Sequence, residues 1–278
     1  MMSKYMLVFI AKLYYNSFMN TKLEKLQKIA KEAGAIIKSG YLAKKEITHK
    51  GVVDLVTEYD LKCEAFIIEE LKEHFSDYTL IGEESWSGGE KSEKAIYIDP
   101  IDGTTNFIHG IPHLAVSIGV YEKGIGLMGV VYNPILNEMF YAQKNGGAYL
   151  NGELLQVSSQ KSLQQSLIGT GFPYAKVNRG AEYEWVMQNL GTLLPNIRDI
   201  RRLGAAALDL CYLAQGKIDG FYEVDLKPWD VAAGMIILAE AGGVYSNVNG
   251  EDYTFDSKTI VATNGKIHKE LLAKLSPF

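Results

Sequence analysis

The sequence has few cysteines, no excess of positive charge and no apolar run long enough to cross a membrane. Only Cys63 and Cys211 occur among its 278 residues. Both are isolated within apolar helical patterns, so we expect buried free thiols rather than a disulfide. No cysteine or histidine spacing matches a zinc site. This use of cysteine fits a reducing compartment, and we predict a cytoplasmic protein.

The charge balance argues against a general nucleic-acid binder. The chain has 28 Lys and Arg against 33 Asp and Glu, a formal net charge of −5, whereas nucleic-acid-binding domains normally carry a basic face. We therefore expect no nucleic-acid partner. A cluster of carboxylates that bind metal ions would account for part of the acidic excess.

Residues 1–21 precede the first amphipathic pattern, which predicts a helix over Lys22–Ser39. The apolar run Tyr5–Ala11 is too short to span a bilayer, and no small-residue cleavage site follows it. We expect an irregular N-terminal extension and no membrane partner.

The pattern of strands and helices changes near the middle of the chain. Hydrophobic residues make up 47% of the sequence, which supports one large domain or two closely packed parts. Residues 22–160 predict helices followed by strands joined by hairpin turns, which is typical of an antiparallel sheet. Residues 161–278 mix helices and strands, and an almost wholly apolar helix predicted at Val231–Ala241 should be buried between layers. We predict an α+β fold.

The most specific chemistry lies in the segment Ile98–Phe107. An apolar run before it predicts a buried strand, which Pro100 should end near Asp99 because proline cannot donate to a strand ladder. Gly103 then permits a sharp turn into a helix. Asp99 and Asp102 would lie beside the free N–H groups of that helix, an arrangement that suits hard cations and a phosphate. The alternative is a tight turn whose aspartates only cap backbone donors.

Further carboxylates lie at the ends of predicted elements. Asp60 precedes a predicted helix over Leu61–Phe75, Asp230 precedes the apolar helix, and Glu83 and Glu84 follow a short predicted strand. Each aspartate could be a simple N-cap. Two adjacent glutamates after a strand are usually a solvated loop. From these residues alone, the structural and functional interpretations both remain open.

Taken together, these strings resemble the inositol monophosphatase family of metal-dependent phosphatases, over roughly residues 22–275. The resemblance rests on four ordered strings: Asp-Leu-Val-Thr-x-x-Asp at 54–60, Gly-Glu-Glu-Ser at 82–85, Asp-Pro-Ile-Asp-Gly-Thr-Thr-Asn-Phe at 99–107 and Trp-Asp at 229–230. Their order and spacing are more specific than any one of them. The resemblance implies a layered αβαβα sandwich, an antiparallel sheet part followed by a second α/β part, with the site between the two.

The resemblance also implies a role for each matching residue. Two or three Mg²⁺ ions would be held by Glu83, Asp99, the Ile101 carbonyl, Asp102 and Asp230. Thr104 and Asp60 would orient the attacking water, with Glu83 also counted as catalytic. The amides of Gly103 and Thr104 would hold phosphate oxygens. The substrate would contact Ala206, Glu223 and Asp230, although Glu223 could equally be an ordinary surface strand residue.

The expected activity is Mg²⁺-dependent hydrolysis of a small phosphomonoester, inositol 1-phosphate, by a metal-activated water without a covalent phosphoenzyme. The alternative substrates are NADP(H), adenosine 3′,5′-bisphosphate and fructose 1,6-bisphosphate, because related enzymes cleave phosphate from these compounds. A catalytically idle metal or phosphosugar binder is the alternative from another class. It predicts a missing metal ligand or a missing Thr104, and neither is missing. The resemblance further implies a homodimer and inhibition by lithium.

Overall fold

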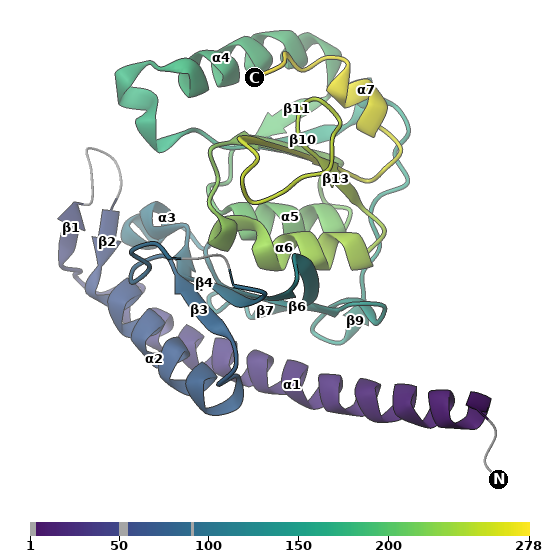
Figure 1. Ribbon diagram of the computed structural model, residues 1–278. Helices are drawn as coiled ribbons and strands as arrows, with labels where there is room; N and C mark the ends of the chain where they lie inside the picture. The colour runs from purple at the N-terminus through teal and green to yellow at the C-terminus, as the bar shows by residue number, and fades with distance from the viewer. Residues whose placement is uncertain (1–3, 50–54, 90–91) are drawn as a thin grey trace.

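Five alternating layers of helices and sheets build the fold in the computed structural model, which describes residues 4–49, 55–89 and 92–278 (Figure 1). The elements in chain order are α1 (Lys4–Gly40), β1 (Ile47–His49), β2 (Leu55–Thr57), α2 (Glu58–His74), β3 (Thr79–Gly82), β4 (Lys94–Asp102), α3 (Thr104–His109), β5 (Ala115–Glu122), β6 (Ile125–Asn133), β7 (Glu138–Gln143), β8 (Gly147–Leu150), β9 (Glu153–Leu154), the 3₁₀ turn η1 (Leu163–Gln165), β10 (Leu167–Thr170), η2 (Tyr174–Asn178), α4 (Ala181–Leu193), η3 (Leu194–Asn196), β11 (Asp199–Arg201), α5 (Ala206–Ala214), β12 (Gly220–Val224), α6 (Pro228–Glu240), β13 (Val244–Ser246), β14 (Thr259–Thr263) and α7 (His268–Leu272).

The first sheet has seven strands in the order β3-β4-β5-β6-β7-β8-β9. Its neighbours are antiparallel except for the parallel pair β3 and β4, so the predicted antiparallel sheet is confirmed apart from that edge. Val116, Ile118 and Val120 pack with α1 and α2, whereas Ala115 and Tyr121 pack with α5 and α6. Both faces of β5 are therefore buried.

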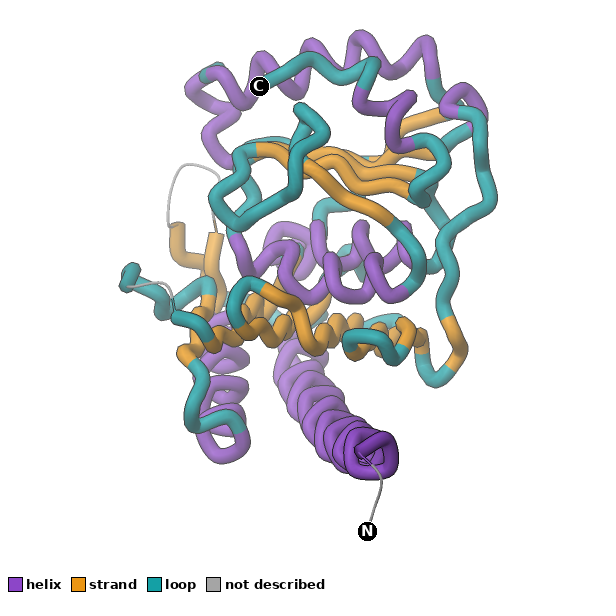
Figure 2. Tube along the Cα trace, turned by 45° about the vertical axis from the view of Figure 1, so that its right-hand side comes forward, coloured by secondary structure: helices purple, strands orange, loops and turns teal. Residues whose placement is uncertain are grey.

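The second sheet has five strands in the order β11-β10-β12-β14-β13. β10 runs parallel to β11 and β12, and β14 runs antiparallel to β12 and β13. Phe221 and Ala262 pack toward α5 and α6, while Tyr222 and Val261 share a cluster with residues of α4 and α7. Figure 2 shows the resulting stack, and the predicted αβαβα sandwich is confirmed.

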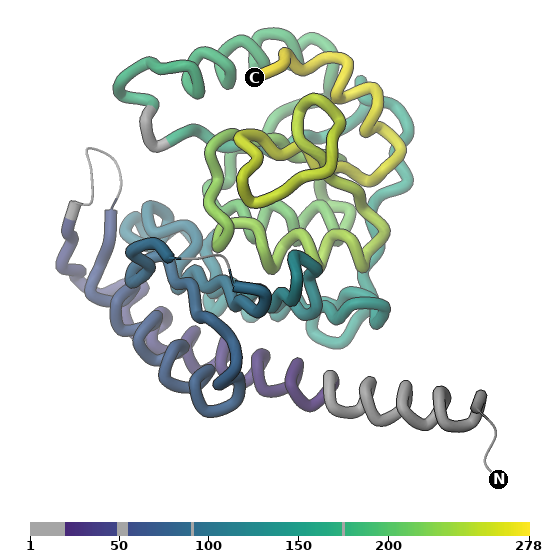
Figure 3. The backbone as a smooth tube through the Cα atoms, viewed as in Figure 1, coloured from purple at the N-terminus to yellow at the C-terminus, as the bar shows by residue number. Residues whose placement is uncertain are grey.

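The middle layer consists of α5 and α6, which belong to the second half of the chain but pack on the first sheet. Small residues allow this close packing: a Cβ built on Gly119 would lie 2.8 Å from Ala232 Cβ, and one on Gly129 would lie 2.6 Å from the Ala233 oxygen. Segments after residue 160 build the upper half of the molecule in Figure 3 and reach its centre through these helices. The predicted burial of the apolar helix is confirmed.

The N-terminal helix begins earlier than the sequence pattern predicts. α1 starts at Lys4 instead of Lys22, so the expectation of an irregular extension is wrong from residue 4 onward. No Gly or Pro separates this segment from the amphipathic part, and the helical hydrogen bonding therefore continues through it. Within the described part of the chain, no helix combines the length and the apolar character that a bilayer crossing requires.

The end of β4 differs from expectation. β4 does not end near Asp99 but runs through Pro100 to Asp102, with a register shift against β5 between the two aspartates. β3 pairs with β4 only as far as Ile98, so no strand on that side needs the missing N–H of the proline. β1 and β2 form an antiparallel pair before α2, and residues 50–54, including Asp54 of the resemblance, lie outside the described residues.

Candidate active site

A cavity between the two parts of the molecule collects the residues that the sequence singled out. Its lining includes Glu83, Asp99, Ile101, Asp102, Gly103, Thr104, Ala206, Glu223 and Asp230. Asp60 does not line the cavity but contacts it through Thr104, whose Oγ1 lies 3.0 Å from Asp60 Oδ1. Every residue predicted for the site is therefore at this cavity or one hydrogen bond away from it.

The bulged end of β4 supplies two buried carboxylates. Asp99 Oδ1 accepts a hydrogen bond from Ile101 N at 3.0 Å. Asp102 accepts from Ala206 N at 3.2 Å and from Ala207 N at 2.7 Å, which are otherwise unsatisfied donors in the first turn of α5. One carboxylate of the first part thereby fixes the start of a helix from the second part.

Asp60 and Asp230 occupy equivalent positions in different helices. The sequence left open that each aspartate is an N-cap, and this interpretation is wrong for both. The N-cap residue is Thr57 in α2 and Lys227 in α6. Each aspartate is the third helical residue and accepts the N–H of its cap residue, at 2.8 Å from Thr57 N and 2.6 Å from Lys227 N. This half of a capping box engages one carboxylate oxygen of each aspartate.

The turn after β4 positions Thr104. Gly103 adopts a left-handed conformation with φ of 96°, which glycine accepts readily, and begins α3. Thr104 Oγ1 lies 3.0 Å from Asp60 Oδ1 and 3.1 Å from the Ile101 oxygen. Its single proton points to one of these acceptors, and its lone pairs remain able to accept from a water. The first N–H groups of α3 have no partner within the helix.

Burial raises the pKa values of the cavity carboxylates, and their mutual repulsion adds to the effect. Burial raises the pKa of Asp99 well above its ordinary value, and the negative charges of Glu83 and Asp102 raise it further. Burial also raises the pKa of Asp102 to about 8, against the lowering effect of the Ala207 N–H. The pKa of Asp230 is raised to about 7, again chiefly by burial. Such a cluster is stable when it is protonated or when it holds cations.

Glu223 reaches into the cavity from β12 and is buried. The position is not an ordinary surface site, so that alternative is wrong. Gly171 provides the space, because a Cβ there would lie 1.8 Å from Glu223 Oε1. Burial raises the pKa of Glu223, and the charge of Asp209 raises it further while that of Arg202 lowers it.

The sequence analysis missed several residues of the cavity. These are Thr170, Gly171, Phe172, Lys176, Arg202 and Asp209. Asp209 is buried, and its Oδ1 lies 3.4 Å from Nε2 of His113. A lone carboxylate in the apolar helix α5 was the available signal for Asp209, since an acidic side chain is seldom fully buried unless it has a partner.

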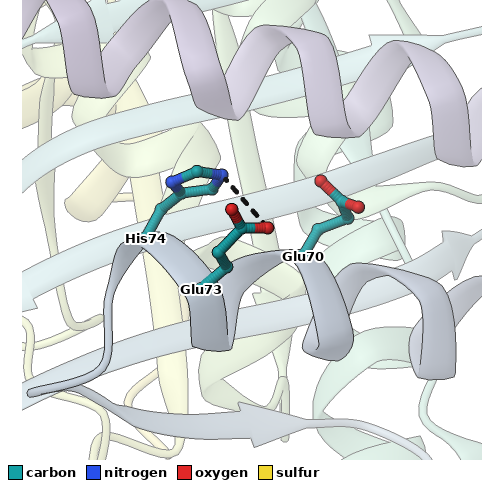
Figure 4. Close-up of side chains that lie close together, drawn as sticks. All are labelled: Glu70, Glu73 and His74. Carbon is teal, nitrogen blue, oxygen red and sulfur yellow. Dashed lines mark ion pairs between the residues drawn. The ribbon is translucent and has the colours of Figure 1, made fainter.

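The donor set of the cavity fits Mg²⁺, which prefers carboxylate and carbonyl oxygens. Asp99 and Asp102 are buried, and no basic side chain in the described part of the chain forms an ion pair with Asp99, Asp102 or Asp230. A second group of acidic and histidine side chains lies outside the cavity: the ligand atoms of Glu70, Glu73 and His74 on α2 all lie within 4.8 Å of one another (Figure 4). That group is not buried, and its members pair with each other and with Lys25.

Comparison with known proteins assigns the chain to a family. A sequence model of the inositol monophosphatase family matches residues 19–278. The chain is 41% identical over 262 residues to "Nus factor SuhB" of Pasteurella multocida (strain Pm70), covering 93% of this chain and 97% of that protein. It is 42% identical over 251 residues to "Inositol monophosphatase 1" of Solanum lycopersicum, covering 88% and 91%.

Solved structures agree with the sequence comparison. The extragenic suppressor protein suhB from Bartonella henselae superposes with a TM-score of 0.86 at 36% identity, covering 92% of this chain and 98% of that one. An IMPase from Thermotoga maritima superposes with a TM-score of 0.83 at 33% identity, covering 91% and 96%. The layered fold is thus that of the metal-dependent phosphatases. The chain belongs to the inositol monophosphatase family and is a phosphatase of that family.

Proposed function

We propose that this protein is a Mg²⁺-dependent phosphomonoesterase that hydrolyses inositol 1-phosphate. The observation that carries the proposal is the cluster of Asp99, Asp102 and Asp230, whose pKa values burial raises and which form no ion pair with a basic side chain among the described residues. A relative at 42% identity bears the name of inositol monophosphatase, which supports inositol 1-phosphate as the first substrate to test.

Glu83, Asp99, Asp102, Asp230 and the Ile101 carbonyl would hold the ions. Bound there, Mg²⁺ would neutralise the phosphate and lower the pKa of a water. These residues come from β4, from the turn after β3 and from the start of α6. The two parts of the molecule must therefore pack together to assemble the complete ligand set.

Thr104 and Asp60 would orient the attacking water. The threonine hydroxyl can donate to Asp60 Oδ1 at 3.0 Å while it accepts from the water. Burial raises the pKa of Asp60, which makes its carboxylate a better proton acceptor than an exposed aspartate. The attack is in line with the leaving alkoxide, and no side chain forms a covalent bond to phosphorus.

The phosphate and the polyol would bind on opposite sides of the scissile bond. The N–H groups of Gly103 and Thr104 at the start of α3 would donate to phosphate oxygens. Glu223, Ala206 and the free oxygen of Asp230 would contact the polyol, with Glu223 accepting from a hydroxyl. We further propose a homodimer and inhibition by lithium, both of which the family resemblance implies. Chromatography with light scattering and a lithium titration can test them.

The test is phosphate release from inositol 1-phosphate, NADP, adenosine 3′,5′-bisphosphate and fructose 1,6-bisphosphate, each with and without Mg²⁺. We expect Mg²⁺-dependent release, fastest from inositol 1-phosphate. A clear preference for NADP or the adenosine bisphosphate would keep the mechanism and replace the substrate. No release from any of them would overturn the proposed activity.

A second candidate is a role as a Nus factor, favoured by the name of the relative that is 41% identical. In this second proposal, the role would not require the phosphatase activity. It predicts that a variant without phosphatase activity, such as Asp102→Asn, still complements loss of the endogenous protein in cells. If this variant fails to complement while folding normally, the phosphatase activity is the one that the cell requires. The prediction of no nucleic-acid partner stays open until this is measured.

A further inference from the structure

One buried acid of the first part has no role in the reaction described above. Glu64 of α2 is only 2% exposed, and it is not among the residues that line the cavity. It forms no ion pair with a basic side chain in the described part of the chain. Acidic side chains are seldom fully buried unless they have a partner, so the burial of Glu64 points to a specific contact.

The partner of Glu64 is the turn that carries Glu83. Glu64 Oε2 accepts a hydrogen bond from Glu84 N at 2.8 Å, and the N–H of Glu83 itself donates to the Ile98 oxygen at 3.1 Å. The first bond holds the peptide unit after Glu83, and the second holds the peptide unit before it. Because each peptide unit is planar and both are held, the direction in which the Glu83 side chain leaves the backbone is fixed as well.

Gly82 brings this turn close to the carboxylate. A Cβ at Gly82 would lie 2.5 Å from Cδ and Oε2 of Glu64 and 2.7 Å from its Oε1. A hydrogen bond from a backbone N–H to a carboxylate is stronger than one to a neutral acceptor, and it requires that the two groups approach closely. The glycine therefore permits the contact between Glu64 and the turn.

The same surface of α2 contacts two further segments of the site. Asp60 lies one helical turn before Glu64, and residues four apart in a helix are neighbours. Asp60 Oδ1 lies 3.0 Å from Thr104 Oγ1, and Cys63 Sγ lies 3.4 Å from the Pro100 oxygen. This surface of α2 thus supports the turn after β3, the end of β4 and the start of α3.

We infer that Glu64 is a positioning residue: through the N–H of Glu84 it fixes the turn that directs Glu83 toward the metal site. The inference rests on the proposed function, in which Glu83 holds an ion. The effect depends on the hydrogen bond to the turn rather than on direct contact with the ion, because Glu64 does not line the cavity. Loss of such a partner, one bond removed from a ligand, lowers metal affinity by roughly ten- to a hundredfold.

Calorimetry of Mg²⁺ binding tests the inference without depending on turnover. Glu64→Ala removes the acceptor, and we expect the Kd for Mg²⁺ to rise about tenfold. The Mg²⁺ concentration for half-maximal phosphate release should rise by the same factor, while kcat at saturating Mg²⁺ should change by less than about threefold. Glu64→Gln keeps an oxygen that can accept from Glu84 N, so its Kd should stay within about threefold of the wild type. Glu69→Ala, at an exposed position of the same helix, is the matched control and should bind Mg²⁺ like the wild type.

Gly82→Ala tests the same contact from the side of the turn. Its Cβ would displace the Glu64 carboxylate, so the Kd for Mg²⁺ should again rise about tenfold. In the double variant with Glu64→Ala the clashing atoms are gone, and binding should be no weaker than in Glu64→Ala alone. Additive losses in the double variant would contradict the inference. If Glu64→Ala does not fold, Gly82→Ala decides alone, and unchanged Mg²⁺ binding in that variant overturns the inference.

These measurements separate failure of the inference from failure of the proposed function. The inference alone fails if the wild type binds Mg²⁺ and Glu64→Ala binds it equally well, or if Glu64→Gln loses as much affinity as Glu64→Ala. A purely structural role would lower the Tm of metal-free Glu64→Ala and leave its Kd for Mg²⁺ unchanged. If the wild type neither binds Mg²⁺ nor releases phosphate from inositol 1-phosphate, the proposed function fails, and the role of Glu64 fails with it.

Discussion

The two parts of the molecule contribute to the cavity in different ways. The first part supplies Asp99, Asp102 and Thr104 from one continuous strand and turn, and its charged groups at the cavity are acidic. The second part supplies Asp230, Glu223, Asp209, Lys176 and Arg202 from separate elements, and these include both signs of charge. Under the proposed function, most metal ligands would come from the first part and Asp230 from the second, whereas the contacts to the polyol would come from the second part.

The largest effect that sharpens this comparison is expected from Asp102→Asn. The change removes one buried carboxylate of the proposed ligand set, and we expect kcat/KM for inositol 1-phosphate to fall by about 10³-fold or more. The increase in Tm caused by Mg²⁺ should also disappear. Steady-state kinetics and thermal unfolding check both. Asp199→Asn, at an exposed acid paired with Arg201, is the control. Activity near that of the wild type in Asp102→Asn would contradict the assignment.

Asp230→Asn tests whether the second part completes the metal site or only the substrate pocket. One oxygen of Asp230 already accepts from Lys227 N, and an amide oxygen can keep that bond, so the start of α6 should remain intact. We expect a loss of about 10²-fold in kcat, together with a higher Mg²⁺ concentration for half-maximal activity. If only KM changed and the Mg²⁺ requirement did not, Asp230 would belong to substrate recognition alone.

Gly171→Ala disturbs recognition without touching the proposed metal ligands. The new Cβ would lie 1.8 Å from Glu223 Oε1, so the glutamate must move and the KM for inositol 1-phosphate should rise about tenfold. Gly191→Ala in α4 meets nothing within 4 Å and should stabilise the fold by about 0.5 kcal/mol with unchanged kinetics. A Gly171→Ala enzyme with normal KM would remove Glu223 from the polyol contacts.

The smallest effect concerns the pH dependence of metal-free stability. Burial gives Asp102 a pKa of about 8 and Asp230 a pKa of about 7, above the ordinary value of 3.8. Between the ordinary pKa of 3.8 and the raised values of about 7 and 8, the folded protein binds more protons than the unfolded chain. The free energy of unfolding of the metal-free protein therefore falls as the pH rises through this range, and the contribution is lost above the raised pKa values. Because Mg²⁺ must displace these protons, its effect on Tm should be larger near pH 8.5 than near pH 6. Equal increments at both pH values would contradict the cluster.

Local patterns predicted much of the fold, and three-dimensional packing explains what they missed. The apolar stretch of α6 predicted a buried helix, and the hairpin signals predicted most of the first sheet. The path of β4 through Pro100 depends on where β3 ends, which no local pattern indicates. Both faces of β5 are buried because α5 and α6 return to the sheet from the second half of the chain, which the sequence of β5 itself does not indicate.

The candidate site likewise contains residues that a local sequence pattern predicted and residues that only the packing of the fold brings together. Asp99, Asp102 and Thr104 lie within a few residues of each other, so one string of sequence was sufficient to predict them together. Asp209 faces His113 from a distant helix, and Arg202 reaches the cavity only because β11 ends there. Their positions depend on pairing between strands and on helix packing across the two parts. A short sequence motif contains no information on either.

The most direct test of the central claim is phosphate release from inositol 1-phosphate by the EDTA-treated wild-type protein as Mg²⁺ is returned. If the carboxylates of β4 and α6 hold the ions that the reaction needs, activity should be absent without metal and should rise to saturation with added Mg²⁺. Undiminished release in the presence of EDTA, or none at saturating Mg²⁺, would contradict the claim.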